Sequence, residues 1–245
     1  MSKIYVIGMG PGAYELMTIK AANALKECDV IVGYTVYIDL LRPHFPEKEF
    51  KTTAMRKEVD RCRMAFEIAR EGKNTAMVCS GDAGIYGMAG LMYEIGEEYP
   101  EIEIEVIAGV TAALSGSAIL GAPLGHDCCL ISLSDLLTPW ELIEERIKRA
   151  AQADFLMCLY NPGSKKRSDY LKKACELMLP FKDANTVCGI AHNIGRDNEY
   201  IQIMTLKELM DTKVDMFSSV FIGNRQTKVL RGKMVTPRGY RHDEK

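Results

Sequence analysis

Three glycine-rich turns, each following a short apolar run, restrict the fold of this chain more than any other feature of its sequence. The turns lie at residues 8–13 (GMGPGA), 80–87 (SGDAGIYG) and 108–113 (AGVTAA). Short apolar runs bounded by glycine are typical of buried strands. Because stretches of helical periodicity separate these runs, we expect βαβ units around a largely parallel sheet.

The alternation continues along the chain and becomes more mixed towards its end. The expected strands are residues 3–7, 30–32, 75–79, 102–107, 128–132, 155–159, 186–191, 199–204, 218–222 and 229–235. The expected helices are residues 18–27, 55–71, 88–99, 140–150, 169–179 and 206–210. Small residues fill positions 112–123. The prediction is therefore an α/β protein of two α/β domains, residues 1–115 and 116–245, with a ligand cleft between them.

The charge balance argues against a general nucleic-acid binder. The 245 residues include 31 Lys and Arg against 33 Asp and Glu, a formal net charge of −2. A nucleic-acid binder usually has a strong basic excess. The apolar start is too short for a signal peptide, and no run approaches the roughly 20 apolar residues that cross a bilayer. We expect a cytoplasmic protein with no nucleic-acid or membrane partner.

Eight cysteines are spread along the chain without any C-x-x-C pair. Thiolate metal sites usually need closer spacing than this. Several of the cysteines, such as Cys79, lie in apolar strand-like runs. We therefore expect reduced core thiols and no bound metal.

The first turn matches G-x-G-x-x-A, a pattern of dinucleotide-binding folds, at Gly8, Gly10 and Ala13. Two features argue against a dinucleotide. Pro11 lacks the backbone N–H that a pyrophosphate would use. The second strand ends in Gly33 and Tyr34, without an acidic residue for a ribose hydroxyl. What remains is an open turn at the carboxyl end of a strand, where ligands bind in open α/β sheets.

The second and third turns each allow two interpretations. Asp82 places a carboxylate beside backbone amides, which suits a zwitterionic, cationic ligand better than a polyphosphate. The alternative is that Asp82 caps the following turn or helix. Thr111 in the third turn is by itself an ordinary N-cap. Three such turns in one half of the chain favour a shared ligand.

In this order the turns resemble the signature of the tetrapyrrole methylase family, G-x-G-P-G, G-D-x-x-x-x-G and G-[VI]-[TS]-[AS], and the similarity covers essentially the whole chain. More specific are residues 80–90 (SGDAGIYGMAG), 131–140 (ISLSDLLTPW), 160–167 (YNPGSKKR) and 236–240 (TPRGY). These resemble the branch that methylates C17 of precorrin-3B or of cobalt-factor III, with ring contraction, in cobalamin biosynthesis. The resemblance implies the tetrapyrrole methylase fold and a homodimer.

The resemblance also implies S-adenosyl-L-methionine as cofactor, with S-adenosyl-L-homocysteine as product. The positions that match cofactor-binding residues of the family are Gly10, Pro11, Ser80, Gly81, Asp82, Ile85, Tyr86, Thr111, Ala112, Tyr160 and Ala191. Ala83 stands where the family commonly has proline.

A precorrin carries many carboxylates, so its site should contain cations and amide donors. The candidates for substrate binding are Asn161, Ser164, Arg167 and Arg196, with Lys165, Lys166 and Arg56 as further cations. Lys165 and Lys166 equally suit a solvated loop.

Ring contraction requires proton movement. The candidates to assist it are His126, Ser134 and Asp135. His126 is alternatively a structural loop residue, and Asp135 a cap of the helix near Trp140.

Several rival functions remain open on the sequence alone. The same fold methylates other ring carbons of precorrins, a ribosomal RNA ribose and a diphthamide intermediate. A non-catalytic protein that only binds S-adenosylmethionine is an alternative from another class. The sequence does not decide whether the tetrapyrrole carries cobalt.

Overall fold

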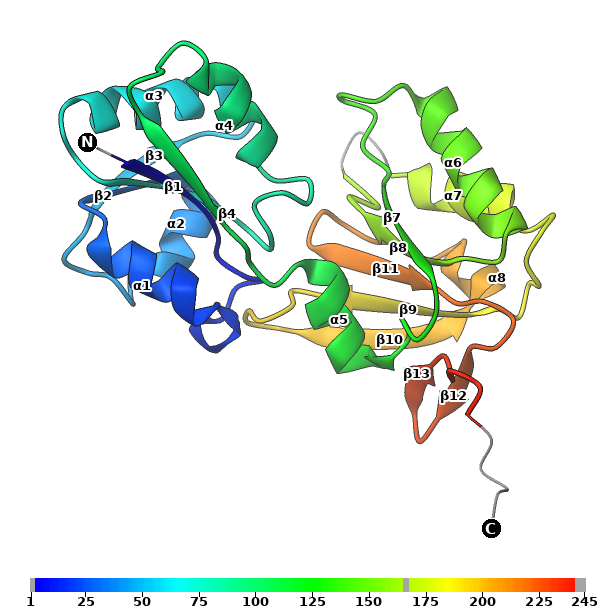
Figure 1. Ribbon diagram of the computed structural model, residues 1–245. Coiled ribbons are helices and arrows are strands. Elements are labelled where there is room, and N and C mark those ends of the chain that lie inside the picture. Colours follow the sequence, from blue (N-terminus) through cyan, green and yellow to red (C-terminus); the bar gives the residue numbers. More distant parts are fainter. Residues whose placement is uncertain (1–2, 165–167, 241–245) are drawn as a thin grey trace. The chain divides into compact units, whose positions relative to one another are not determined.

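The computed structural model describes residues 3–164 and 168–240 (Figure 1). The chain forms two compact units, Met1–Ala112 and Ala113–Lys245, each with its own sheet and core. The sequence placed the boundary between residues 115 and 116. Arg167, Lys165 and Lys166, which the sequence analysis named, lie outside the described residues.

The first unit contains a five-stranded, wholly parallel sheet in the order β3-β2-β4-β1-β5. Its strands are β1 (Lys3–Gly8), β2 (Val30–Tyr34), β3 (Glu49–Thr53), β4 (Thr75–Cys79) and β5 (Glu103–Ile107). Strand β4 is buried along its whole length, as its apolar sequence predicts for a central strand of a parallel sheet. The predicted parallel sheet is confirmed.

Helices cover both faces of this sheet (Figure 1). The helices are α1 (Ile19–Glu27), α2 (Thr35–Leu41), α3 (Glu58–Arg70) and α4 (Ala89–Gly96), with a short 3-10 turn, η1 (Tyr14–Leu16). Residues of α1 and α2 share one buried cluster with Ile7 and Ile31, and residues of α3 and α4 share the other with Ile4 and Val6. Neighbouring residues of β1 thus point to opposite faces, as strand geometry requires.

The strand order creates a switch point between β1 and β4, which are neighbours in the sheet. From β1 the chain continues through α1 to β2, and from β4 it continues through α4 to β5. These two helices lie on opposite faces of the sheet. The chain therefore leaves β1 and β4 towards opposite faces of the sheet, at the carboxyl ends of adjacent strands, where open α/β sheets bind ligands.

The second unit contains a mixed five-stranded sheet in the order β10-β9-β11-β8-β7. Its strands are β7 (Cys128–Ser132), β8 (Leu156–Tyr160), β9 (Val187–His192), β10 (Tyr200–Thr205) and β11 (Ser218–Ile222). Only β7 and β8 pair in parallel; the other neighbours are antiparallel. Consequently β7, β8 and β9 end at one edge, where β10 and β11 begin. We call this the carboxyl edge of the second sheet.

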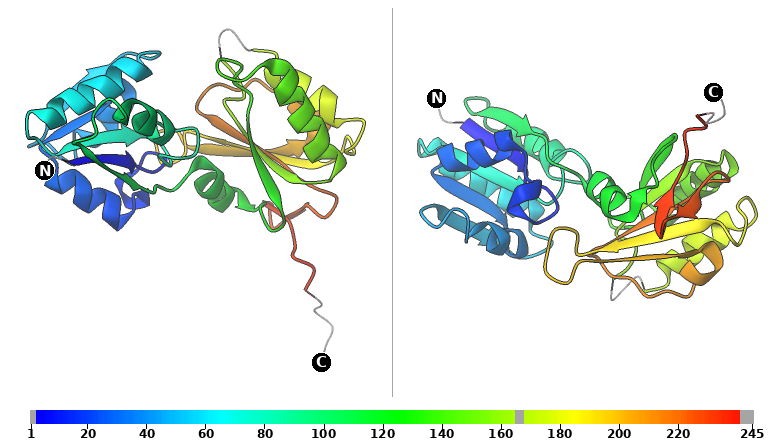
Figure 2. Two further views of the ribbon diagram at one scale, coloured as in Figure 1. Left: turned by 45° about the horizontal axis from the view of Figure 1, so that its top comes forward. Right: turned by 90° about the horizontal axis from the view of Figure 1, so that it is seen from below.

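Helices α6 (Trp140–Gln152), α7 (Tyr170–Met178) and α8 (Leu206–Leu209) pack on one face of the second sheet through a large apolar cluster. Helix α5 (Ala112–Leu120) lies on the other face (Figure 2), where Gly116 of α5 approaches Phe221 of β11. A smaller sheet of β6 (Gly121–Ala122), β13 (Lys233–Val235) and β12 (Lys228–Leu230) follows.

Three features of the fold differ from the sequence prediction. The single strand expected at residues 229–235 is the hairpin β12–β13, which turns at Arg231 and Gly232 with φ of 51° and 72°. Helix α3 begins at Glu58 rather than at residue 55, because Arg56 has a left-handed φ of 66°. Helix α2 and strand β3 were not predicted.

We predict that an ion-pair network between β1 and β5 makes the first unit sensitive to acid. The Glu105 carboxylate lies 2.6 Å from Lys3 Nζ and 2.7 Å from Lys20 Nζ. Hydrogen bonds from Lys20 and Lys3 lower the pKa of Glu105 from 4.5 to about 2. A lowered pKa stabilises the fold above the unfolded value, and the stabilisation is lost as pH falls from about 4.5 towards 2.

The midpoint temperature of thermal unfolding, measured from pH 6 to pH 2, should therefore fall less steeply for Glu105→Gln than for the unmodified chain. The matched control is Glu97→Gln, at an exposed carboxylate for which the described residues provide no ion pair. Equal slopes for all three chains would show that the network adds nothing to acid sensitivity.

Candidate functional site

The first and second glycine-rich turns are joined by backbone hydrogen bonds beyond the ends of β1 and β4. Met9 N–H donates to Cys79 O at 2.9 Å, and Gly10 and Gly81 exchange two hydrogen bonds of 3.1 and 2.7 Å. Two turns that lie about 70 residues apart in the sequence thus form one short antiparallel bridge. The structure brings together the turns that the sequence singled out.

Glycine is required here because the three turns approach one another. A Cβ on Gly8 would lie 2.6 Å from Gly109 N and 2.7 Å from Gly81 O. A Cβ on Gly109 would lie only 2.1 Å from Gly81 O. At Gly81 the backbone φ is +70°, and the nearest atom to an added Cβ is 3.6 Å away, so there the demand is conformational.

Asp82 ties the second turn to the third. Its Oδ1 accepts hydrogen bonds from Gly84 N at 2.8 Å and Ile85 N at 3.1 Å, and its Oδ2 accepts from Gly109 N at 2.9 Å. This is the local capping role that the sequence left open, extended to a second loop. Asp82 therefore stabilises the conformation of the second and third turns through hydrogen bonds to their backbone.

The remaining residues of these turns differ in exposure. Pro11 and Thr111 are buried, Ser80, Ile85 and Ala112 are half-buried, and Tyr86 is exposed. Tyr86 has a left-handed φ of 54° and a side chain that is 54 % exposed. A left-handed non-glycine residue costs about 1 kcal/mol or more, and such strain is concentrated at functional sites.

Ser132, the last residue of β7, joins two of the predicted site residues at the carboxyl edge of the second sheet. Its Oγ accepts hydrogen bonds from Asn161 Nδ2 at 3.0 Å and from Ser134 N at 3.2 Å. Asn161 follows β8 directly and has a left-handed φ of 52°. Polar groups from β7 and β8 are thus gathered at one point.

Asp135 is held by a tyrosine of α7. Tyr170 Oη donates to Asp135 Oδ2 at 2.7 Å, and this hydrogen bond, together with burial, raises the pKa of Tyr170. The Trp140 ring packs 4.4 Å from the Tyr170 ring. The N-cap of α6 is Pro139, without a side-chain capping bond. The alternative in which Asp135 caps this helix is therefore wrong.

Other predicted residues of the second unit lie along the same edge. Tyr160 Oη accepts a hydrogen bond from Ala113 N at 2.9 Å. Ala191 is fully buried within β9, between β10 and β11. The Arg196 guanidinium lies 5.6 Å from the centre of the Phe217 ring. Ser164 is half-buried.

His126 is separated from the other two catalytic candidates. It precedes β7, whereas Ser134 and Asp135 follow it, so His126 lies at the opposite edge of the sheet. Its Nε2 is 2.7 Å from the carbonyl oxygen of Pro237. This contact ties the loop before β7 to the segment after β13. This contact supports the structural interpretation of His126, and its catalytic role stays a prediction. Arg56 lies in the first unit, on the exposed loop before α3.

A histidine that is not among the predicted catalytic candidates lies at the carboxyl edge instead. His192 ends β9, and its Nε2 is 3.2 Å from Asp215 Oδ2. The two residues are 23 positions apart, and only the pairing of β9 with β11 brings them together. The single sequence signal was a histidine at the end of a predicted strand.

Comparison with known proteins identifies the family. The family model of the tetrapyrrole (corrin/porphyrin) methylases matches residues 3–210. This chain belongs to the tetrapyrrole methylases. It is 45 % identical over 236 residues to the probable cobalt-factor III C(17)-methyltransferase of Salmonella typhimurium, covering 96 % of this chain and 98 % of that one. It is 37 % identical to the precorrin-3B C(17)-methyltransferase of Sinorhizobium sp, covering 97 % and 96 %.

The fold of this methylase agrees with that of a solved relative. The crystal structure of the methyltransferase CobJ superposes with a TM-score of 0.89 at 35 % sequence identity, covering 97 % of this chain and 100 % of that chain. The predicted α/β fold and the family resemblance are thereby confirmed.

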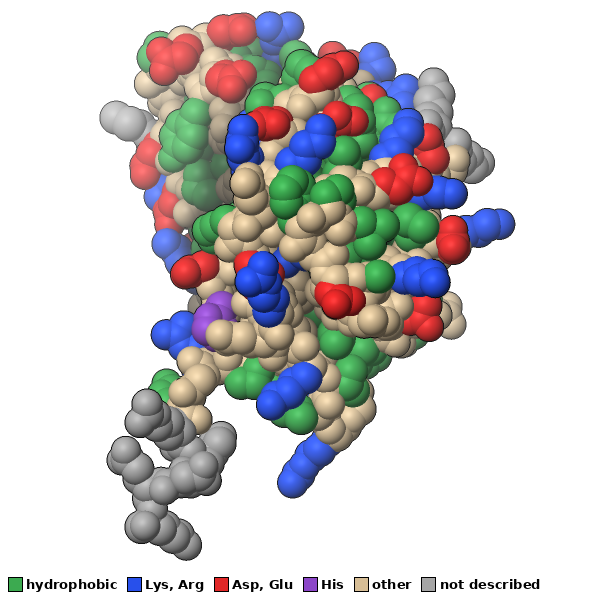
Figure 3. All heavy atoms as spheres, turned by 90° about the vertical axis from the view of Figure 1, so that its right-hand side faces the viewer, with side chains coloured by type: hydrophobic (Ala, Val, Ile, Leu, Met, Phe, Trp, Pro, Cys, Tyr) green, Lys and Arg blue, Asp and Glu red, His purple; other side chains and the backbone are tan. Residues whose placement is uncertain are grey.

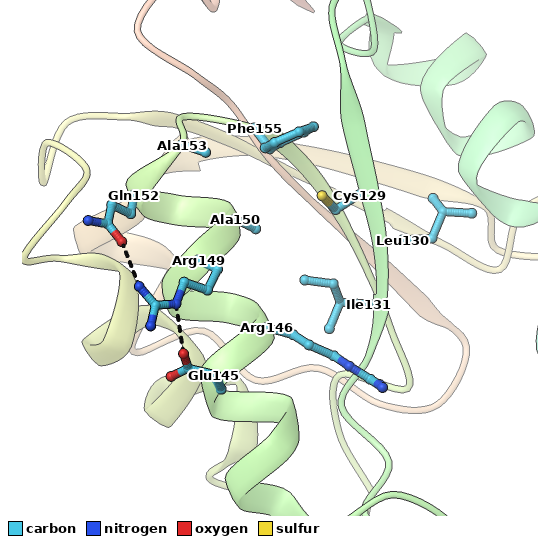
Figure 4. Close-up of a pocket in the computed structure, with 10 residues that line it drawn as sticks. All are labelled: Cys129, Leu130, Ile131, Glu145, Arg146, Arg149, Ala150, Gln152, Ala153 and Phe155. Carbon is cyan, nitrogen blue, oxygen red and sulfur yellow. Dashed lines mark hydrogen bonds and ion pairs between the residues drawn. The ribbon is translucent and has the colours of Figure 1, made fainter.

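One pocket of the second unit lies away from the carboxyl edge of its sheet. It has a volume of about 710 Å³ and lies between β7 and α6 (Figure 4). Its lining is mostly apolar and includes Cys129, Ile131 and Phe155. On α6, the Arg149 guanidinium pairs with the Glu145 carboxylate. The polar candidates are absent from this lining, so we do not assign the site to it.

The thiols and metal-ligating side chains of the described residues form no further candidate site. Six of the eight cysteines are buried, and burial raises the pKa of Cys79, for example, to about 11. The described residues contain no group of three or more metal-ligating side chains. Basic and acidic side chains are interspersed on the face seen in Figure 3. Within the described ranges, no helix has both the length and the apolar character to cross a membrane.

We predict that Gly109→Ala disrupts the three turns together. The added methyl group must displace the backbone of Gly81 or Gly8, which costs about 1–3 kcal/mol of stability. Gly90→Ala on α4 is the control, because nothing lies within 4 Å of its Cβ. Gly90→Ala should leave stability unchanged or raise it by up to about 1 kcal/mol. Chemical denaturation that finds equal stability for the two variants would contradict the close contact of the turns.

We predict that Asp82→Ala lowers stability and cofactor affinity together. Three backbone amides lose their acceptor, for a total of about 1–3 kcal/mol, and the second turn is released from the third. Asp82→Asn, which keeps one acceptor oxygen, should be intermediate. Thermal unfolding and calorimetric titration with S-adenosylmethionine measure both effects. Loss of affinity at unchanged stability would mean instead that the carboxylate contacts the ligand directly.

Proposed function

We propose that this methylase transfers a methyl group from S-adenosylmethionine to C17 of cobalt-factor III or precorrin-3B, with ring contraction, on the route to cobalamin. The observation that carries the proposal is the three-turn cluster of residues 8–13, 80–87 and 108–112 in a chain 45 % identical over nearly its full length to a probable cobalt-factor III C(17)-methyltransferase.

The hydrogen bonds within the turns favour the binding of a nucleoside that carries no polyphosphate. The backbone N–H groups of Gly10 and Gly81 bond to each other's carbonyls, and those of Gly84, Ile85 and Gly109 bond to Asp82. These are the donors with which a glycine-rich loop would bind phosphate. They are already used, and a carboxylate lies among them, so a dinucleotide is disfavoured and a cationic zwitterion is tolerated.

We propose that the cofactor lies against the carboxyl edge of the first sheet. Gly10, Pro11, Ser80 and Gly81 would contact it through backbone atoms, and Ile85 and Tyr86 through apolar side chains. The left-handed backbone and the exposed side chain of Tyr86 support this location of the cofactor. Thr111 and Ala112 would line the third turn. Tyr160 and Ala191 remain proposed contacts from the family match alone.

We propose that the carboxyl edge of the second sheet binds the acidic tetrapyrrole. Asn161 and Ser164 offer donors after β8, and Arg196 offers a guanidinium that can grip a carboxylate bidentately. Arg167 is retained from the family match. Methyl transfer from a sulfonium needs mainly alignment of donor and acceptor, and positioning can contribute roughly 7–11 kcal/mol. Ser134 and Asp135 stay as candidates for assisting proton movement.

The names of the relatives support cobalt-factor III as the first choice of substrate. Identity is 45 % to a probable cobalt-factor III enzyme and 37 % to a precorrin-3B enzyme. The unpaired thiols support a reducing, cytoplasmic location. Family resemblance supports a homodimer, which light scattering on the purified protein would test.

The proposal is tested by anaerobic incubation of the protein with S-adenosylmethionine and either cobalt-factor III or precorrin-3B. We expect a product heavier by one methyl group, faster with cobalt-factor III, and a contracted ring by NMR. Gly109→Ala should give little product, and Gly90→Ala normal amounts. Binding of S-adenosylmethionine without turnover of either tetrapyrrole would favour a non-catalytic binding protein and overturn the proposal.

A further inference from the structure

His192 combines two features that distinguish it from every other histidine among the described residues. It lies at the carboxyl edge of the second sheet, on β9, and it is paired with a carboxylate, since its Nε2 is 3.2 Å from Asp215 Oδ2. Its other ring nitrogen, Nδ1, is buried and is the one buried side-chain nitrogen or oxygen of the described residues without a hydrogen-bond partner. A buried polar atom without a partner is unfavourable until a ligand satisfies it.

Asp215 is firmly anchored. Its Oδ1 accepts hydrogen bonds from Phe217 N at 2.9 Å and Ser218 Oγ at 3.1 Å, which leaves Oδ2 for His192. Burial acts to raise the pKa of Asp215, but the hydrogen bonds from His192, Phe217 and Ser218 outweigh it and lower the pKa. An ionised carboxylate accepts only, so Nε2 of His192 must carry the proton. In the neutral imidazole, Nδ1 is then a lone-pair acceptor.

The groups that face or adjoin His192 come from β10, β11 and the loop after β9. The Tyr200 ring of β10 stacks on the imidazole at 4.7 Å, and Ser218 of β11 lies opposite it in the ladder. In the loop after β9, Arg196 is placed over Phe217, and Glu199 accepts a hydrogen bond from Gly195 N. Asp215 is therefore the charged group in hydrogen-bond contact with the imidazole, and it has the sign that stabilises an imidazolium.

Methyl transfer from a sulfonium to carbon creates a need for such a base. The new C–CH₃ bond uses an electron pair of the macrocycle, and the S–CH₃ bond breaks with its pair left on sulfur. The macrocycle then carries one additional positive charge until a proton leaves it. The base that takes this proton must lie at the tetrapyrrole-binding edge.

We propose that His192 is this base and that Asp215 is its positioning residue. The inference rests on the proposed function. The macrocycle–H bond breaks with its electron pair returned to the ring, and an Nδ1–H bond forms on His192. Asp215 holds the tautomer that leaves Nδ1 free and stabilises the resulting imidazolium, a division of roles familiar from histidine–carboxylate pairs.

The other titratable candidates suit this role less well. His126 lies at the opposite edge of the sheet and contacts the Pro237 carbonyl. Asp135 already accepts a hydrogen bond from Tyr170. His44 belongs to the first unit and stacks on Tyr14 at 4.8 Å.

The test is single-turnover methyl transfer across a range of pH by the full chain, with saturating S-adenosylmethionine and the tetrapyrrole that the unmodified protein methylates. His192→Gln keeps a polar side chain but cannot take the proton. We expect its maximal rate to fall about 10²-fold or more, with KM for the tetrapyrrole and affinity for S-adenosylmethionine changed less than about threefold. The acid limb of the rate profile should disappear.

Three further variants and a control separate catalysis from structure. Asp215→Asn should slow transfer and alter the pH profile, and Asp215→Glu should recover part of the rate. His192→Ala should regain activity when imidazole is added. His44→Gln, the matched control in the first unit, should keep the rate and profile of the unmodified protein.

The outcomes distinguish this inference from the function on which it rests. If the unmodified protein transfers no methyl group, the proposed function fails. If it transfers methyl and His192→Gln keeps its rate and profile, or changes only KM, the assignment of His192 is overturned. Should His192→Gln not fold, an unchanged profile for a folded Asp215→Asn overturns it equally.

Discussion

The hydrogen bond between the Asp82 carboxylate and the backbone of Gly109 is the interaction on which the candidate cofactor surface depends. It joins the loop after β4 to the loop after β5, and the exchange of hydrogen bonds between Gly10 and Gly81 adds the loop after β1. Glycines at 8 and 109 permit the approach, because any side chain there would meet backbone within 3 Å. A surface assembled from three strand ends is thereby fixed in shape before any ligand arrives.

This arrangement decides which ligands suit the surface. In a phosphate-binding loop the backbone amides point at the ligand. Here the amides of residues 10, 81, 84, 85 and 109 are turned inwards to carbonyls or to Asp82. The side chains of Ile85 and Tyr86 are at least partly exposed beside them. Such a surface suits a sulfonium nucleoside and gives a physical reason why a G-x-G-x-x-A pattern need not indicate a dinucleotide.

Much of the fold and of the candidate site could be predicted from the sequence, and the features that were missed have physical reasons. Apolar runs such as residues 75–79 marked central strands because burial on both faces demands them. Strand β3 was missed because its sequence, EFKTT, is largely polar, and as the outermost strand of the first sheet it is largely exposed. The predicted strand 128–132 already separates His126 from Ser134 and Asp135, but the contact of His126 with Pro237, 111 residues away, depends on the fold. The His192–Asp215 pair needed the antiparallel register of β9 and β11, which no local pattern encodes.

A crystal structure of the methylase with S-adenosylhomocysteine measures the central claim most directly. We predict ligand atoms in contact with the backbone at residues 10–11 and 80–82 and with the side chains of Ile85 and Tyr86, while Asp82 still accepts its hydrogen bond from Gly109. A ligand bound away from these turns, or one that displaces Asp82 from Gly109, would contradict the claim.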